Sequence, residues 1–340
     1  RNVTHARALF TDLGFVINED KSITIPTQQL QFLGFILDST LMRITLTPDK
    51  KEKLIALCSS VLAKAEITIA ELSQIIGTIV SSLPGVEYGK LHYRQLEIDK
   101  NTALKLYKGD YKALLSLSIR AQSELRWWFE NVQQSFNPIS HGNPDMTLVT
   151  DASKLGWGAH IDGDITQGLW NIEESLLHIN ELELKAIYFA VKAFSPRMEG
   201  KHVKVESDNS TAVCYINAMG GTKSPSCNDI TYLIWSWCIT KNIWLTATHI
   251  AGVDNVRADK QSRVFNVRTE WMLSRTVFSQ ITDLWEQPDI DLFASRINTQ
   301  LPRFVSWHPD PEAIFVDAFT IDWSPFFIYA FPPFCLIHRC

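Results

Sequence analysis

The order of strand and helix patterns between residues 146 and 265 constrains the fold more than any other feature of the chain. Three β-type runs come first, MTLVTDA, GWGAHIDG and ITQGLW. Helical patterns follow at 180–194, 210–219, 227–241 and 254–265, with β-type runs at 202–207 and 242–250 between them. Three strands followed by alternating helices and strands predict a mixed sheet with helices on its faces. We therefore expect an α/β and α+β mixed protein built around such a sheet.

The segment before residue 137 has a different pattern. QFLGFILDSTLMRITL reads as two β-type runs joined by DST, which predicts a hairpin. Thr47 and Pro48 then stand at the N-cap and first position of a helix. Thr68 and Glu71 have the spacing of a capping box at the start of a second helix. This segment should fold as a β-hairpin followed by helices.

Turn-forming residues divide the chain. The stretch NPISHGNPDM, residues 137–146, separates the first segment from the predicted sheet, and prolines are spread through the sequence after residue 266. A length of 340 residues suggests two or three domains. We expect domains at 1–136, 145–265 and 266–340, the last with an irregular fold.

Charge and cysteine content argue against some classes of protein. The net charge of −5 argues weakly against a nucleic-acid binder, although the acidity is concentrated in the later part of the chain. The six cysteines include no C-x-x-C pair, so zinc-ribbon and thioredoxin sites lack support. We expect a reduced, intracellular setting, cytoplasmic or nuclear, with no signal peptide and no membrane span.

Four carboxylates stand at conspicuous positions of the middle segment. Asp151 ends the first, apolar strand, Glu183 lies in the first helix, Asp208 follows the fourth strand and Asp259 lies in the last helix. A buried carboxylate is costly unless a positive partner meets it. Taken singly, Glu183 also fits a solvated helix position, and Asp208 fits the N-cap of the helix that begins near Ser210.

Their joint pattern favours a metal site. If the first and fourth strands are neighbours, Asp151 and Asp208 meet at the same edge of the sheet and repel each other unless cations intervene. Carboxylate oxygens without Cys or clustered His select Mg²⁺ or Mn²⁺. Two such ions clamp the attacking water and the leaving oxygen of a phosphodiester. The pattern therefore predicts metal-assisted hydrolysis.

The middle segment resembles the ribonuclease H domain of reverse transcriptases. The matching pieces are TDAS with Asp151, NELELKAI with Glu183, ESDNSTAV with Asp208 and HIAGVDNVRADKQSR with Asp259, over residues 145–265. The resemblance implies that the four acids bind two Mg²⁺ ions, Mn²⁺ being the alternative. It also implies that the enzyme cuts the RNA strand of an RNA-DNA hybrid and leaves a 3′-hydroxyl.

Further residues take roles from the same resemblance. His249 matches a histidine that helps product release or shuttles a proton, and a structural histidine at a strand end is the alternative. Asn180 matches a position near the RNA 2′-hydroxyl, and helix N-capping is an equally good interpretation. Asn209 is a second candidate for nucleic-acid contact. Glu181 lies on a different helix face from Glu183, so the E-L-x-A pattern favours Glu183 as the metal ligand.

The first segment is similar to the end of a reverse transcriptase palm, FLGFILD, followed by a thumb. Lys50, Lys53 and Arg94 are candidates for contact with a template-primer duplex, although each also suits an ordinary solvated helix face. The sequence contains no D-D pair, so the chain should lack the polymerase site. We expect a fragment of a longer polyprotein whose remainder is a partner. A non-catalytic template- and primer-binding scaffold is the alternative function.

Two stretches narrow the resemblance further. ITIAELSQIIGTIVSSLPGVEYGKLHYRQL and DIDLFASRINTQ look most like DIRS-like retrotransposons. The tail from residue 288 is also similar to adenine-N6 methyltransferases. That family usually begins its last motif with Asp or Asn, whereas Phe331 stands there and offers no hydrogen-bonding group. We interpret the tail as a degenerate or incomplete methyltransferase-like region.

Overall fold

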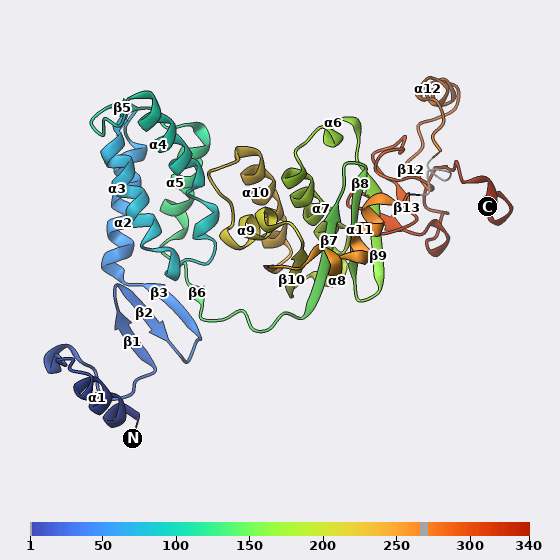
Figure 1. Ribbon diagram of the computed structural model, residues 1–340. Coiled ribbons are helices and arrows are strands. Elements are labelled where there is room, and N and C mark those ends of the chain that lie inside the picture. Colours follow the sequence, from blue (N-terminus) through green and yellow to red (C-terminus); the bar gives the residue numbers. More distant parts are fainter. Residues whose placement is uncertain (1, 266–270) are drawn as a thin grey trace.

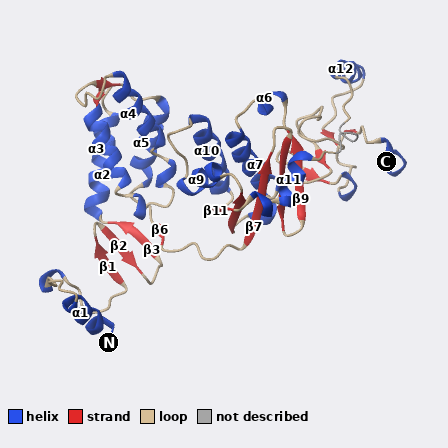
Figure 2. Ribbon diagram, viewed as in Figure 1, coloured by secondary structure: helices blue, strands red, loops and turns tan. Residues whose placement is uncertain are grey.

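The computed structural model describes residues 2–265 and 271–340. Figure 1 shows three bodies in a row: a helical body near the N-terminus, a central sheet with helices, and a loop-rich C-terminal body. Figure 2 shows one small sheet beside the N-terminal helices and a larger sheet in the middle of the molecule. The predicted mixed sheet flanked by helices is confirmed.

The first sheet is antiparallel and has the order β1-β2-β3-β6. Its strands are β1 (Gln29–Phe32), β2 (Phe35–Asp38), β3 (Arg43–Leu46) and β6 (Asn137–Pro138). The predicted hairpin is confirmed as β2 and β3, but the interpretation of QFLGFILD as one β-type run is wrong. Leu33 and Gly34 have positive φ angles of 49° and 81°, so the chain turns there and forms β1 and β2 from one apolar run.

Four helices form the body above this sheet. They are α2 (Pro48–Leu62), α3 (Ile69–Val80), α4 (Arg94–Leu106) and α5 (Ile119–Asn131), with the short strands β4 (Ile67–Thr68) and β5 (Leu114–Leu115). Thr47 is the N-cap residue of α2, with proline at the first helical position. The Thr68 hydroxyl accepts from the Glu71 backbone N–H, and Glu71 accepts from that of Thr68, so the predicted capping box is confirmed.

Outside these elements, short helices extend the first segment. Helix α1 (Asn2–Asp12) and the 3₁₀ turn η1 (Glu19–Lys21) precede β1, and two further turns, η2 (Leu83–Gly85) and η3 (Gly89–Leu91), join α3 to α4. Helix α1 contains no buried residue.

The central sheet has the order β11-β10-β7-β8-β9. Its strands are β7 (Met146–Ala152), β8 (Gly156–Ile161), β9 (Asp164–Leu169), β10 (His202–Ser207) and β11 (Trp244–His249). Strands β7, β8 and β9 are antiparallel, whereas β10 pairs in parallel with both β7 and β11. The first and fourth strands of this segment are therefore neighbours, which is the condition under which Asp151 and Asp208 were expected to meet.

Helices cover both faces of this sheet. The helices are α6 (Ile172–Ser175), α7 (Ile179–Ala193), α8 (Ser195–Met198), α9 (Ser210–Ala218), α10 (Pro225–Thr240) and α11 (Val256–Arg263), with the turn η4 (Gly252–Asp254) before α11. Leu148 and Trp157 belong to the buried core shared with α7, α9 and α10. On the opposite face, a Cβ at Gly158 would meet α11 at 2.4 Å, so glycine allows this helix to lie close to β8.

The first body packs against α9 and α10 of the central one. Arg120 forms an ion pair with Asp229 at 2.6 Å. The ring of Tyr88 contacts Trp235, with ring centroids 6.4 Å apart. The buried side chain of Leu91 belongs to the central core. The contacts between the two bodies are thus apolar as well as ionic.

The C-terminal body has little regular structure. It contains α12 (Arg275–Leu284), the turns η5 (Ala318–Thr320) and η6 (Phe334–Arg339), and the short parallel pairs β12 (Ile290–Asp291) with β15 (Ile328–Tyr329) and β13 (Val305–Ser306) with β14 (Phe315–Val316). Residues 266–270 of the predicted third domain lie outside the described residues. Irregular structure after residue 271 agrees with the sequence prediction.

One buried ion pair joins this body to the sheet. The Arg296 guanidinium donates to both carboxylate oxygens of Glu174, at 2.8 and 3.2 Å, and to the Leu169 carbonyl at 3.0 Å. Lys185 also pairs with Glu174, at 2.9 Å. A cavity of about 420 Å³, which Trp157 and Phe293 help to line, lies between the sheet and the C-terminal body.

The structure adds two observations, one about the helices and one about the cysteines. Among the residues that the structure describes, none of the helices combines the length and the apolar character that crossing a membrane requires. The six cysteines are all free thiols.

Candidate active site

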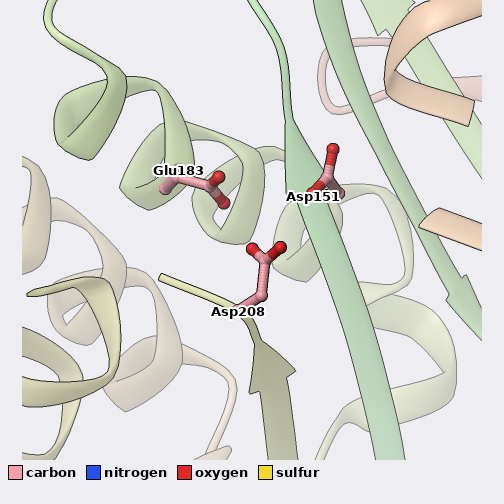
Figure 3. Close-up of side chains that lie close together, drawn as sticks. All are labelled: Asp151, Glu183 and Asp208. Atoms are coloured by element: carbon pink, nitrogen blue, oxygen red, sulfur yellow. The ribbon is translucent and has the colours of Figure 1, made fainter. Parts of the chain in front are cut away.

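Three carboxylates from three elements meet at one edge of the central sheet. Asp151 lies in β7, Glu183 in α7, and Asp208 directly follows β10. One oxygen from each carboxylate lies within 4.8 Å of the others. Figure 3 shows the three side chains pointing toward one another. We refer to these three residues as the acid cluster.

The strand register explains why two of these acids meet. Glu206 of β10 pairs in parallel with Val149 of β7. Two residues further along each strand, the same register places Asp208 beside Asp151. Parallel strands end at the same edge of a sheet, so both carboxylates extend from one edge. Helix α7 packs against β7 and brings Glu183 to them.

The alternative structural roles of two of these acids are wrong. Glu183 is not a solvated helix residue, because its relative exposure is 4%. Asp208 is not the N-cap of α9, because the side chain of Asn209 takes that position and accepts from the Ala212 backbone N–H at 2.9 Å. Neither carboxylate therefore has the structural role that the sequence offered as an alternative.

Burial and mutual repulsion change the acidity of the cluster. Burial, together with the charges of Asp151 and Asp208, raises the pKa of Glu183 to about 9, although the Ala152 backbone amide and Arg263 act in the opposite direction. Burial also raises the pKa of Asp151 to about 6, against a hydrogen bond from Ser262. Among the described residues, the buried Oε2 atom of Glu183 has no hydrogen-bond partner. The cluster therefore presents an unpaired oxygen where a cation is favourable.

The fourth predicted acid lies beside the cluster and not within it. Asp259 is on α11, and its Oδ1 atom accepts from Nε of Arg263 at 2.7 Å. Its charge contributes to the raised pKa of Asp151, so the two carboxylates are electrostatically coupled. The structure thus gathers three of the four predicted acids and places Asp259 next to them.

Two buried residues that the sequence analysis did not identify hold Asp151 in place. Ser262 Oγ donates to Asp151 Oδ2 at 2.6 Å, and Asn255 Nδ2 donates to Oδ1 at 3.3 Å. Asn255 Nδ2 also lies 3.2 Å from the Thr150 carbonyl. Asn255, Asp259 and Ser262 are spaced i, i+4 and i+7, so they share one helix face. With Asp259 taken as a candidate ligand, that spacing is the signal in the sequence that could have identified Asn255 and Ser262.

The other predicted residues of the middle segment surround the cluster. His249 is exposed, and its Nε2 atom lies 3.0 Å from the Asp208 carbonyl oxygen. Asn209 Nδ2 donates to Asn180 Oδ1 at 3.0 Å. The N-capping interpretation of Asn180 is wrong, because His178 is the N-cap of α7 and accepts from the Asn180 backbone N–H. Glu181 completes the capping box of α7, which separates its role from that of Glu183.

The three basic candidates of the first body have different surroundings. Lys53 is exposed. Lys50 donates to the Ser81 carbonyl at 2.6 Å and lies over the Phe35 ring. Arg94 donates to the Ala218 carbonyl at 3.1 Å and pairs with Glu97. The solvated helix face considered for Arg94 is therefore wrong, because this side chain joins two bodies of the molecule.

The chemistry of the acid cluster suits a hard divalent cation. All of its ligand atoms are carboxylate oxygens, and no Cys or His is among them. Mg²⁺ and Mn²⁺ prefer such ligands. The buried Oε2 atom of Glu183, which has no hydrogen-bond partner within residues 2–265 and 271–340, also indicates a site for a cation. These residues therefore fit the metal that the sequence predicted.

This chain is similar to a viral enzymatic polyprotein. The enzymatic polyprotein of cauliflower mosaic virus, strain D/H, is 28% identical over 148 residues, which cover 39% of this chain and 21% of the relative. The same protein of strain Strasbourg has the same identity and coverage. The chain thus spans about a fifth of the length of the curated relatives it matches. No family model matches the chain.

The solved structures similar to this chain include a ribonuclease H1 and a viral reverse transcriptase. Ribonuclease H1 from the archaeon Halobacterium salinarum aligns with 34% of this chain and 92% of its own, at 16% identity and a TM-score of 0.29. The foamy viral protease-reverse transcriptase in complex with an RNA/DNA hybrid aligns with 65% of this chain and 29% of its own, at 16% identity and a TM-score of 0.29.

Proposed function

We propose that residues 145–265 form a ribonuclease H domain that hydrolyses the RNA strand of RNA-DNA hybrids. The observation that carries this proposal is the acid cluster, in which three carboxylates meet and a buried oxygen of Glu183 lacks a partner among the described residues. The order of the four acid-bearing motifs and the similarity to a viral enzymatic polyprotein support the same assignment.

In this proposal Asp151, Glu183 and Asp208 bind Mg²⁺ or Mn²⁺, and Asp259 completes the ligand set for two ions. Bound divalent cations supply an activated water and charge stabilisation at the leaving oxygen. The protein holds the ligands for this chemistry: Ser262 and Asn255 fix both carboxylate oxygens of Asp151. Burial of Glu183 keeps its carboxylate in low dielectric, where its interaction with a cation is strong.

The polar residues around the cluster are assigned to substrate. Asn180 and Asn209 form a hydrogen-bonded pair of amides, which can both donate to and accept from a ribose 2′-hydroxyl. His249 is exposed near Asp208, where its imidazole can carry a proton to or from the 3′-oxygen that is released. The resemblance to ribonuclease H domains implies both roles, and the position of these side chains beside the acid cluster supports them.

The flanking bodies are assigned by their sequence resemblance. We propose that residues 1–136 are the end of a reverse transcriptase palm with its thumb, which holds a template-primer duplex through cations such as Lys53. Lys50 and Arg94 are weaker candidates because they make intramolecular contacts. We assign residues 266–340 to a degenerate methyltransferase-like region of a DIRS-like retrotransposon polyprotein. The polymerase metal site would belong to another part of that polyprotein.

A cleavage assay tests the nuclease. The 340-residue chain is incubated with an RNA-DNA hybrid labelled on the RNA strand, with Mg²⁺ and then with EDTA. Asp208→Asn removes one acid of the cluster and is expected to abolish cleavage. The control is Asp254→Asn, which removes an exposed carboxylate from the turn before α11 and should cleave like the wild type.

The result separates the enzyme from the alternative scaffold. Cleavage of the RNA strand that requires a divalent cation and disappears in Asp208→Asn supports the proposal. Binding of the hybrid without cleavage at any Mg²⁺ or Mn²⁺ concentration refutes it and favours a template- and primer-binding scaffold. Equal loss of activity in Asp254→Asn would also count against a specific role for the acid cluster.

A further inference from the structure

Arg263, in the last turn of α11, holds the fourth acid at the edge of the candidate site. Its Nε atom donates to Asp259 Oδ1 at 2.7 Å, four residues earlier on the same helix. The two side chains are 58% and 44% exposed. An exposed ion pair of this kind stabilises a fold only weakly, because water screens both charges. Stabilising α11 is therefore a weak explanation for this pair.

The charge of Arg263 acts on the acid cluster as well. It opposes the rise in pKa of both Asp151 and Glu183. In return, Asp259, Asp151 and Asp208 raise the pKa of Arg263, with the hydrogen bond to Asp259 as the largest contribution. A cation that interacts with all four acids neutralises part of the charge that would otherwise attract metal ions.

Arg257 on the same helix has different surroundings. Its guanidinium donates to the Gly163 carbonyl at 2.6 Å, in the turn between β8 and β9. The coupling to the cluster is thus a property of the position of Arg263 and not of the basic residues of α11 in general. Arg257 provides a matched control for the removal of one positive charge from this helix.

We propose that Arg263 keeps Asp259 out of the acid cluster and that binding of the second divalent cation requires Asp259 to leave Arg263. This proposal rests on the assignment of Asp259 as a metal ligand in the proposed function. A carboxylate oxygen that binds a cation loses much of its attraction for the guanidinium, and the guanidinium repels the incoming cation. Arg263 therefore weakens the second binding step more than the first, because only the second step has to break its ion pair with Asp259.

Binding of Mn²⁺ tests this without any activity measurement. Free Mn²⁺ is counted by electron paramagnetic resonance during titration of the full chain, for the wild type and for Arg263→Gln, Arg263→Lys and Arg257→Gln. We expect two binding steps, with the second tightened about 3- to 10-fold in Arg263→Gln, the size of effect expected when one nearby charge and its ion pair are lost. Arg263→Lys should change it less, and Arg257→Gln should match the wild type.

The outcomes distinguish this inference from the function on which it rests. An unchanged or weakened second step in Arg263→Gln overturns the role of Arg263, while two-ion binding by the wild type leaves the proposed nuclease standing. An equal effect in Arg257→Gln also overturns it, because the effect would then reflect overall charge. A wild type that binds no Mn²⁺ overturns both proposals. Matching thermal unfolding curves confirm that the variants fold.

Discussion

The raised pKa of Glu183 makes metal binding depend on pH. With a pKa of about 9, Glu183 keeps a proton in the metal-free protein near neutral pH, and a cation must displace that proton. At about pH 7.5 the difference of about 1.5 pH units corresponds to about 2 kcal/mol, or about 30-fold in apparent affinity. The affinity for Mg²⁺ should rise by up to about tenfold per pH unit and level off near the pKa of Glu183.

Calorimetry measures this directly. Titration with Mg²⁺ in two buffers of different ionisation enthalpy gives the number of protons released, which we expect to approach one per site near neutral pH. Glu183→Gln cannot release this proton, so both the release and the steep pH dependence should largely disappear. Glu181→Gln is the matched control, because Glu181 belongs to the capping box of α7 and glutamine can retain that interaction.

A flat pH dependence of Mg²⁺ affinity in the wild type between about pH 6 and 9 would refute this reasoning, because it would mean that Glu183 is already ionised there. Proton release that persists in Glu183→Gln would assign the proton to another group. Asp151, with a pKa raised to about 6, would then be the first to examine.

Four further outcomes are expected. Burial raises the pKa values of Asp151 and Glu183, so their contribution to the stability of the metal-free protein is full below about pH 4 and is lost as the pH rises through about 6 and 9. The melting temperature should therefore fall over that pH range. Added Mg²⁺ should restore it. Asn255→Ala should cost about 1–3 kcal/mol in chemical denaturation and slow cleavage, whereas an unchanged rate would mean that Asp151 is held without it. Gly158→Ala places a Cβ 2.4 Å from Gln261 Cβ and 2.8 Å from the Ala258 carbonyl oxygen, so it should destabilise the protein by about 1–3 kcal/mol. A melting temperature equal to that of the wild type would contradict the close packing of α11. Arg296→Ala removes one of the two cations that pair with Glu174 among the described residues and should cost about 3 kcal/mol in the docking of the C-terminal body. Faster hydrogen exchange in residues 290–310 would show this loss, and unchanged exchange would contradict it.

Local physical chemistry determined much of this protein from the sequence. The bounds of β7 and β10 agree with the predicted strands because alternating side chains and β-branched residues favour extended backbone over short distances. The capping box at Thr68 and Glu71 depends on a single turn of helix, so its four-residue pattern was sufficient. The order of strands and helices likewise limited the central body to a mixed sheet.

The hydrophobic pattern of the sequence did not predict other features of the structure. One apolar run became two strands because Leu33 and Gly34 turn the chain, and the run itself predicted a single strand. Arg94 resembled a surface cation, yet it contacts the C-terminal end of α9, more than a hundred residues away. Hydrophobic periodicity carries no information about such partners.

The candidate site also has features that the sequence predicted and features that only the folded chain decided. The sequence identified its acids, but only the folded chain decided that Asp151, Glu183 and Asp208 share one cluster while Asp259 pairs with Arg263. Burial and the distance between charges set the pKa of each group, and both depend on which segments the sheet brings together. The sequence therefore determined the residue types and element order of this protein, whereas tertiary packing decided their acidity, their partners and their position around a cation.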